Sequence, residues 1–251
     1  MNVDLSADVT GWLLVFCRVG AILMLLPGLG DDSIPARIKL VFGLLLALAI
    51  APIVVAKFPT AASGDLHLGS MVVGEVLVGL IYGALIRIMF SAIMVAGTII
   101  STQTGLAMAA VFDPTMGGQN PVLSRLLTVG AIVLMFSMDV HHLFIAGMVR
   151  SYDLFQPGGA LMWGDLSSLA VSTIGKAFAV GIQLSAPFLL YGFIFNVALG
   201  FIARLTPTIQ VFFVAQPLNM LFTFGLLIVC AGLILGLFVS YFTEVVRTLV
   251  G

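Results

Sequence analysis

Charged residues are scarce in this chain. Only 8% of its 251 residues are Asp, Glu, Lys or Arg, whereas 61% are hydrophobic. Soluble domains carry about 25% charged residues, so this chain has too few to cover its own surface in water. We therefore expect its surroundings to be lipid or other protein subunits. The net charge is −1 and the sequence has no basic run, which argues against nucleic-acid binding.

Cysteine is rare as well. Cys17 and Cys230 each lie in an apolar run, and the sequence has no CxxC motif. This pattern predicts packed thiols rather than a disulfide framework or a metal site, and we expect no cofactor. The catalytic motifs HExxH and GxSxG are also absent, so the sequence favours a protein that is not an enzyme. Asp4, Asp8 and Arg18 argue against a cleaved signal peptide.

Long apolar stretches dominate the chain instead. A helix needs about 20 apolar residues to span a bilayer, and the alternation typical of membrane strands is absent. The predicted fold class is all-α, with long, kinked helices, and Pro187 predicts a kink in the fifth. The third, fifth and sixth exceed the length of one perpendicular crossing. The predicted helices lie near Gly11–Gly28, Lys39–Ala56, Ser70–Ile100, Val122–Val149, Leu169–Leu205 and Val211–Val246. Lysine and arginine are balanced between the two sets of loops, so the orientation stays open.

The longest interruption of the apolar pattern is Ser101–Pro121. Its Asp-Pro and Asn-Pro pairs and its glycines are typical of irregular backbone, yet methionine, valine and phenylalanine keep it apolar. A solvated loop would hold fewer apolar side chains, so we expect this segment to lie inside protein. The residues alone leave a re-entrant loop, a selectivity filter and a packed connector open.

Polar side chains inside the apolar stretches are costly at membrane depth, so they normally face protein or water. One interpretation is a transporter with a proton relay that includes Asp139 and His141. A second is an intramembrane enzyme in which Asp139 and His142 share a helix face while His141 points elsewhere. The third, which we favour residue by residue, is polar contact between helices or subunits, such as a pair between Lys176 and Glu244. The candidate residues are Arg18, Glu75, Arg87, Asp139, His141, His142, Lys176, Asn196, Arg204 and Glu244.

Small residues recur four positions apart on several predicted helices. Gly79 and Gly83 form one such pair, Gly232 and Gly236 another, and Gly192 and Gly200 line one face with Asn196 and Arg204. Such spacing lets helix backbones approach closely. Packing within the chain would explain such stripes, but their recurrence on several helices favours packing against other subunits as well.

Several ordered motifs link these stretches to a known family. Phe112-Asp113-Pro114, Pro121–Ser124 and Asp139-x-His141-His142 are followed by Ser185-Ala186-Pro187, Asn196, the run Ala198–Pro207 and Gln210-Val211-Phe212. Together they resemble the FliR family of flagellar export-gate proteins and its injectisome relatives SctT and SpaR. The resemblance covers essentially the whole chain, and Phe-Asp-Pro favours the flagellar branch. Val140 departs from the pattern, because the family often has glycine there.

The resemblance implies a non-enzymatic subunit of the flagellar type III export gate, a channel for unfolded flagellar proteins. The implied location is the bacterial inner membrane at the flagellar basal body, partly above the membrane plane. The implied partners are FliP-like and FliQ-like subunits, with FlhB and FlhA nearby, and membrane lipid. Residues 1–150 would correspond to a FliP-like part and residues 151–251 to a FliQ-like long helical hairpin. The alternative is a self-contained transporter or channel that uses Asp139 and His141.

The resemblance also implies a pore plug. In the family, the loop between the third and fourth helices closes the pore, and on this chain that loop is residues 105–120 within 101–121. Methionine adapts to irregular surfaces and would help to seal the pore, and glycine would let the loop move. The implied plug residues are Gly105, Met108, Val111, Phe112, Asp113, Pro114, Met116, Gly117 and Gly118.

Overall fold

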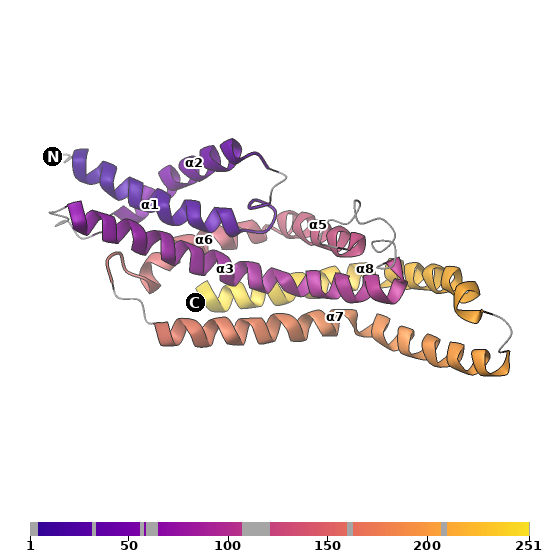
Figure 1. Ribbon diagram of the computed structural model, residues 1–251. Coiled ribbons are helices and arrows are strands. Elements are labelled where there is room, and N and C mark those ends of the chain that lie inside the picture. Colours follow the sequence, from indigo (N-terminus) through magenta and orange to yellow (C-terminus); the bar gives the residue numbers. More distant parts are fainter. Residues whose placement is uncertain are drawn as a thin grey trace. The chain divides into compact units, whose positions relative to one another are not determined.

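The computed structural model describes residues 5–31, 34–55, 58, 65–106, 121–159, 163–206 and 210–250. Its elements are all helices, which confirms the predicted all-α fold class. The helices are α1 (Leu5–Leu25), α2 (Ala36–Val54), α3 (Asp65–Thr104), α5 (Val122–Ser137), α6 (Val140–Leu154), α7 (Trp163–Leu205) and α8 (Val211–Val250) (Figure 1).

The prediction of one continuous fourth helix, Val122–Val149, is wrong. The structure divides this stretch into α5 and α6 at Met138 and Asp139. Asp139 has φ 58° and ψ 19°, the left-handed conformation, and it is the single non-glycine residue with positive φ in the described part of the chain. A right-handed helix cannot pass through such a residue, and aspartate is one of the few side chains that tolerate it.

Four described helices are long and apolar enough to cross a membrane. The qualifying segments are Ala36–Val54, Leu68–Thr104, Leu166–Leu205 and Phe213–Arg247, and α5 with α6 would add a fifth only as one broken span. Helices α3, α7 and α8 contain 40, 43 and 40 residues. Each is about twice the length that a bilayer crossing needs, which confirms the excess length predicted for three helices.

The chain forms two compact units that alternate along the sequence. Unit 1 comprises Met1–Met89, Asp139–Ile174 and Thr243–Gly251, and unit 2 comprises Phe90–Met138 and Gly175–Phe242. Both units therefore draw on residues from either side of position 150. The division into a FliP-like part and a FliQ-like hairpin at that position stays a prediction.

In unit 1, α1 packs closely against the first half of α3 at a pair of glycines. A Cβ atom on Gly79 would lie 2.6 Å from the carbonyl oxygen of Arg18 and 2.8 Å from the Cβ of Ala21. One turn later, a Cβ on Gly83 would lie 2.9 Å from the Cβ of Leu25. Only glycine permits this approach, so the chain itself fills the Gly79–Gly83 face.

In unit 2, the second half of α3 lies among α5, α7 and α8. Phe90 of α3 packs edge-on against Phe238 of α8, with ring centroids 5.3 Å apart, and Figure 1 shows the two helices side by side. The Ser124 hydroxyl of α5 donates a hydrogen bond to the Met94 carbonyl at 3.1 Å. On α7, Gly181 lies against Val95 of α3.

Helices α7 and α8 each bury only one narrow stripe of side chains. The stripe on α7 includes Thr173, Ala177, Leu184 and Phe188, and α8 has a similar stripe, with the spacing of three or four residues expected for one helix face. Their other faces are also apolar but lie exposed. The largest exposed side chains include Val171, Phe178, Leu190, Phe193, Phe201 and Leu205 on α7 and Phe213, Val214, Leu221, Ile228, Val229 and Leu233 on α8.

Candidate functional site

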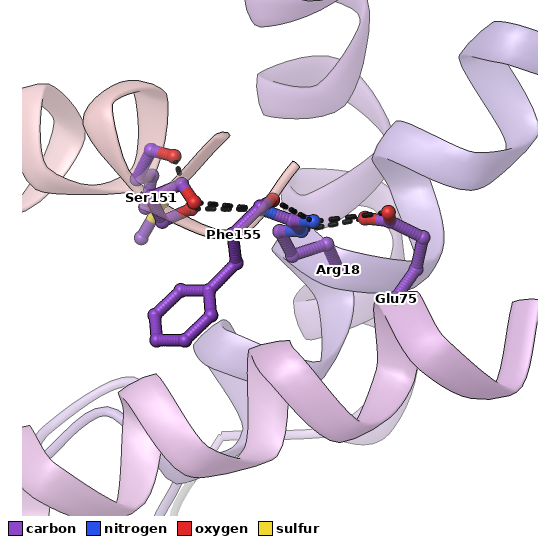
Figure 2. Close-up of polar contacts among 5 residues, drawn as sticks. Arg18, Glu75, Ser151 and Phe155 are labelled. Carbon is purple, nitrogen blue, oxygen red and sulfur yellow. Dashed lines mark hydrogen bonds and ion pairs between the residues drawn. The ribbon is translucent and has the colours of Figure 1, made fainter. Parts of the chain in front are cut away.

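Arg18 is the polar centre of unit 1. It lies on α1 among buried aliphatic side chains and is only 1% exposed. Its Nε donates a hydrogen bond to Oε2 of Glu75 at 2.5 Å, and its Nη2 donates to Oε1 at 2.9 Å (Figure 2). Glu75, on α3, is 2% exposed. This is a bidentate, fully desolvated ion pair, the geometry in which a guanidinium and a carboxylate interact most strongly.

The C-terminal end of α6 completes the coordination of Arg18. Nη1 donates to the carbonyl oxygen of Ser151 and Nη2 to that of Phe155, each at 3.0 Å (Figure 2). The carbonyls at the C-terminal end of a helix carry partial negative charge, so they attract a guanidinium. The ring of Tyr152 lies 3.9 Å from the guanidinium carbon. Arg18 therefore connects α1, α3 and the end of α6.

This arrangement is suited to holding helices together rather than to moving ions. The guanidinium contacts acceptors on both sides and is sealed from solvent. Arginine also stays protonated in proteins, so it does not relay protons. Residues Ser151, Tyr152 and Phe155 had no place in the sequence-based site. Two of them contribute backbone carbonyls, for which side-chain identity carries no signal.

A second polar cluster, in unit 2, surrounds the end of α3. The side-chain amide of Asn219, on α8, donates a hydrogen bond to the Gln103 carbonyl at 2.9 Å. Gly105 follows the helix with φ 79°, which favours glycine. The side chain of Gln216, on α8, occupies the space where a Cβ of residue 105 would lie. These contacts fix the point at which the chain leaves α3.

This cluster leads into the segment predicted to plug a pore. Among the implied plug residues, only Gly105 belongs to the described part of the chain. Met108, Val111, Phe112, Asp113, Pro114, Met116, Gly117 and Gly118 lie outside the described residues. The segment ends at Pro121, the residue before α5. Gly97 of α3 lies so close to Ser124 of α5 that a Cβ atom on Gly97 would not fit.

A third cluster lies at the start of α6. The Asp139 carboxylate oxygen Oδ1 is 4.0 Å from Nε2 of His141 and 3.8 Å from Nδ1 of His142. The imidazole rings of His141 and His142 are 4.2 Å apart. The expectation that His141 points away from the other two side chains is therefore wrong. That expectation assumed a regular helix through Asp139, whereas the left-handed residue places its carboxylate within 4.0 Å of one nitrogen of each ring.

Comparison with known proteins decides the family. The sequence model described as bacterial export proteins, family 1, matches residues 9–245. The chain belongs to this family.

Relatives within the bacterial export proteins support the assignment. The chain is 42% identical to the flagellar biosynthetic protein FliR of Caulobacter vibrioides over 217 residues, 85% of each chain. It is 31% identical to the Bacillus subtilis protein of that name over 241 residues, 95% of this chain and 92% of the relative. The Yop proteins translocation protein T of Yersinia pestis is 30% identical over 179 residues, 69% and 67% of the two chains. These findings confirm the family resemblance drawn from the motifs.

Membership of the bacterial export proteins has two direct consequences. The family consists of export components and not of enzymes, so this chain is not an enzyme. The apolar helices and the family together make it a membrane protein of an export apparatus.

The other polar residues singled out in this export protein lie on exposed helix surfaces. Asn196 is exposed on α7, and its side-chain amide donates to the Gly192 carbonyl of its own helix at 2.8 Å. The exposed charged residues are Arg87 on α3, Lys176 and Arg204 on α7, and Glu244 on α8.

Proposed function

We propose that this chain is a subunit of the flagellar type III export gate, where FliP-like and FliQ-like subunits complete a channel for unfolded flagellar proteins. Its family, and relatives named as flagellar biosynthetic proteins, support this role. In this proposal FlhB and FlhA lie nearby at the basal body in the inner membrane.

The observation that carries the proposal is the length of the exposed apolar surface on α7. Val171 is 70% exposed and Leu205 is 79% exposed, and they lie 34 positions apart in the sequence. At about 1.5 Å per residue, they lie about 50 Å apart along the helix. A hydrocarbon core of about 30 Å, crossed at a tilt of about 40°, covers only about 40 Å. Lipid alone therefore leaves part of this surface uncovered.

The part of the apolar α7 surface that lies outside the hydrocarbon core would pack against other protein subunits. An exposed apolar helix face of this length is typical of an interface rather than of a free surface. This reasoning also supports a position partly above the membrane plane. Part of α7 would then be apolar because it is buried in the assembly, and not because it faces lipid.

We also propose that residues 105–120 form the pore plug. Support comes from the two ends of the segment, which leave α3 and enter α5 at tightly packed positions. Asn219 and Gln216 hold the first end, and Ser124, against Gly97, holds the second. Fixed ends would return the segment to one closed position after each passage of substrate.

Co-purification tests the gate proposal. The chain is expressed with and without its FliP-like and FliQ-like partners, extracted in mild detergent and analysed by native mass spectrometry. We expect a hetero-oligomer in the first sample and the detergent-bound chain alone in the second. A stable monomer or homo-oligomer that ignores both partners would contradict the proposal. It would favour the self-contained transporter that uses Asp139 and His141.

Ion leakage tests the plug. Deletion of residues 110–115 is expected to raise membrane conductance in cells that contain the assembled complex. The matched control is a deletion of equal length, residues 59–64, which lies outside the proposed plug and should leave conductance low. If the first deletion assembles normally and conductance is unchanged, this segment is not the plug.

A further inference from the structure

Three side chains that commonly bind metals converge at the N-terminal end of α6, at the opposite end of that helix from the Arg18 contacts. We propose that Asp139, His141 and His142 bind one divalent transition-metal ion, with Zn²⁺ as the best match. This site is separate from the gate and plug roles proposed above, and neither role depends on it.

The distances between the donor atoms suit an ion held among them. One donor atom from each residue lies within 4.8 Å of the other two. The carboxylate oxygen is 4.0 Å from one imidazole nitrogen and 3.8 Å from the other, which is beyond hydrogen-bond distance. Neighbouring ligand atoms around tetrahedral zinc are about 3.4 Å apart, given bond lengths of about 2.1 Å. The donors need to approach one another by only about 0.4–1.4 Å.

Side-chain rotation supplies this movement without disturbing the fold. The side chains of Asp139 and His142 are 76% and 69% exposed, and that of His141 is 32% exposed. The backbone positions are already set by the left-handed conformation of Asp139 and the first turn of α6. Binding therefore requires little more than rotation of the exposed Asp139 and His142 side chains toward Nε2 of His141.

The donor set indicates the class of metal. Two imidazoles and one carboxylate suit zinc and other divalent transition metals, and they match Mg²⁺ and Ca²⁺ poorly because those ions prefer oxygen ligands. Three protein ligands leave at least one position open to water or to a ligand from another subunit. A bound ion would connect the left-handed residue to the first turn of α6 and stabilise the break that separates α5 from α6.

Metal titration of the full-length chain tests the site. The chain is purified with its partner subunits, without a polyhistidine tag, stripped with EDTA and titrated with Co²⁺, whose visible absorption reports nitrogen and oxygen ligands. We expect one Co²⁺ ion per copy of this chain, displaced by one Zn²⁺ ion. We expect His142→Ala to weaken Zn²⁺ binding at least tenfold, and position 142 is exposed. We expect the same of Asp139→Asn, because asparagine also tolerates the left-handed backbone conformation. His141→Ala/His142→Ala should weaken it more than a hundredfold.

The remaining histidine of the sequence supplies the control. His67→Ala should leave both the absorption spectrum and the number of bound ions unchanged. Equal binding by the wild type and by His141→Ala/His142→Ala would overturn the proposal. So would a wild-type complex that fails to bind one ion per copy of this chain at micromolar Zn²⁺. Either result would leave co-purification with the FliP-like and FliQ-like partners unaffected, so failure of the metal site is distinguishable from failure of the gate proposal.

Discussion

Helices α3 and α7 are similar in length and apolar character, yet the chain buries them to very different extents. In their most apolar stretches, 56% of α3 is buried but only 17% of α7. Helix α3 has α1 on its first half and α5, α7 and α8 around its second half, and its glycines fit those neighbours. Helix α7 contributes one stripe to the chain and leaves the rest of its apolar surface exposed.

The contrast separates two causes of hydrophobicity in the same sequence. Apolar residues on α3 are required for the chain to fold, whereas most of those on α7 are available to lipid and to other subunits. Changes on α3 and its contacts should therefore lower the stability of the isolated chain. Matched changes on α7 should leave that stability intact and affect assembly instead.

The largest expected effect comes from breaking the ion pair of α3. Arg18→Ala leaves Glu75 buried without its partner, which costs about 3–5 kcal/mol of unfolding free energy. Denaturation of the detergent-solubilised chain measures the loss. Arg87→Ala, at an exposed position of α3, is the control and should change stability by less than about 0.5 kcal/mol. The double variant Arg18→Met/Glu75→Leu should recover part of the lost unfolding free energy, because it removes both charges together. Equal stability of Arg18→Ala and Arg87→Ala would show that the buried pair does not hold the helices.

A smaller effect, of opposite sign on the two helices, is expected for added methyl groups. Gly79→Ala on α3 places a Cβ against the Arg18 carbonyl, and this overpacking costs about 1–3 kcal/mol. Gly200→Ala on α7 meets nothing within 4 Å, so the better helix propensity of alanine should stabilise the isolated chain by about 0.5–1 kcal/mol. Thermal unfolding in detergent compares the two variants. A loss of stability at both positions would remove the distinction between the helices.

The smallest expected effect concerns the end of α3. Asn219→Ala removes the hydrogen bond to the Gln103 carbonyl and should cost about 0.5–1.5 kcal/mol. Asn196→Ala on α7 removes a bond within an exposed helix, and the gain in helix propensity should offset it. The same denaturation assay compares the unfolding free energies of the Asn219→Ala and Asn196→Ala variants. If Asn196→Ala proves the more damaging, the described contact at Gln103 is not what fixes the end of α3.

Much of the fold was predictable because the apolar stretches are long. The predicted stretch Val211–Val246 begins at the same residue as α8, and Leu169–Leu205 ends at the same residue as α7. The break between α5 and α6 was not predictable from hydrophobicity, since Met138 and Val140 on either side of Asp139 are both apolar. One left-handed residue ends a helix without changing the apolar pattern around it.

The candidate site was predictable in its residues but not in its pairings. Arg18 and Glu75 stand out as charges in apolar stretches, but 57 positions separate them and no local pattern links them. The carbonyls of Ser151 and Phe155 are backbone groups at the end of a helix, so no side-chain motif marks them. The placement of His141 failed because helical geometry was assumed across Asp139.

In the proposed export gate, neighbouring subunits cover part of the exposed apolar surface of α7. Photo-crosslinking in cells tests it most directly, with a benzophenone amino acid placed at Val171, Phe193 or Leu205, all exposed positions on α7. Because the first and last positions are too far apart for one hydrocarbon core, we predict that at least one of them yields adducts with FliP-like or FliQ-like subunits. Crosslinks to lipid alone at all three positions, in cells that export flagellar proteins normally, would show that lipid and not other subunits covers α7.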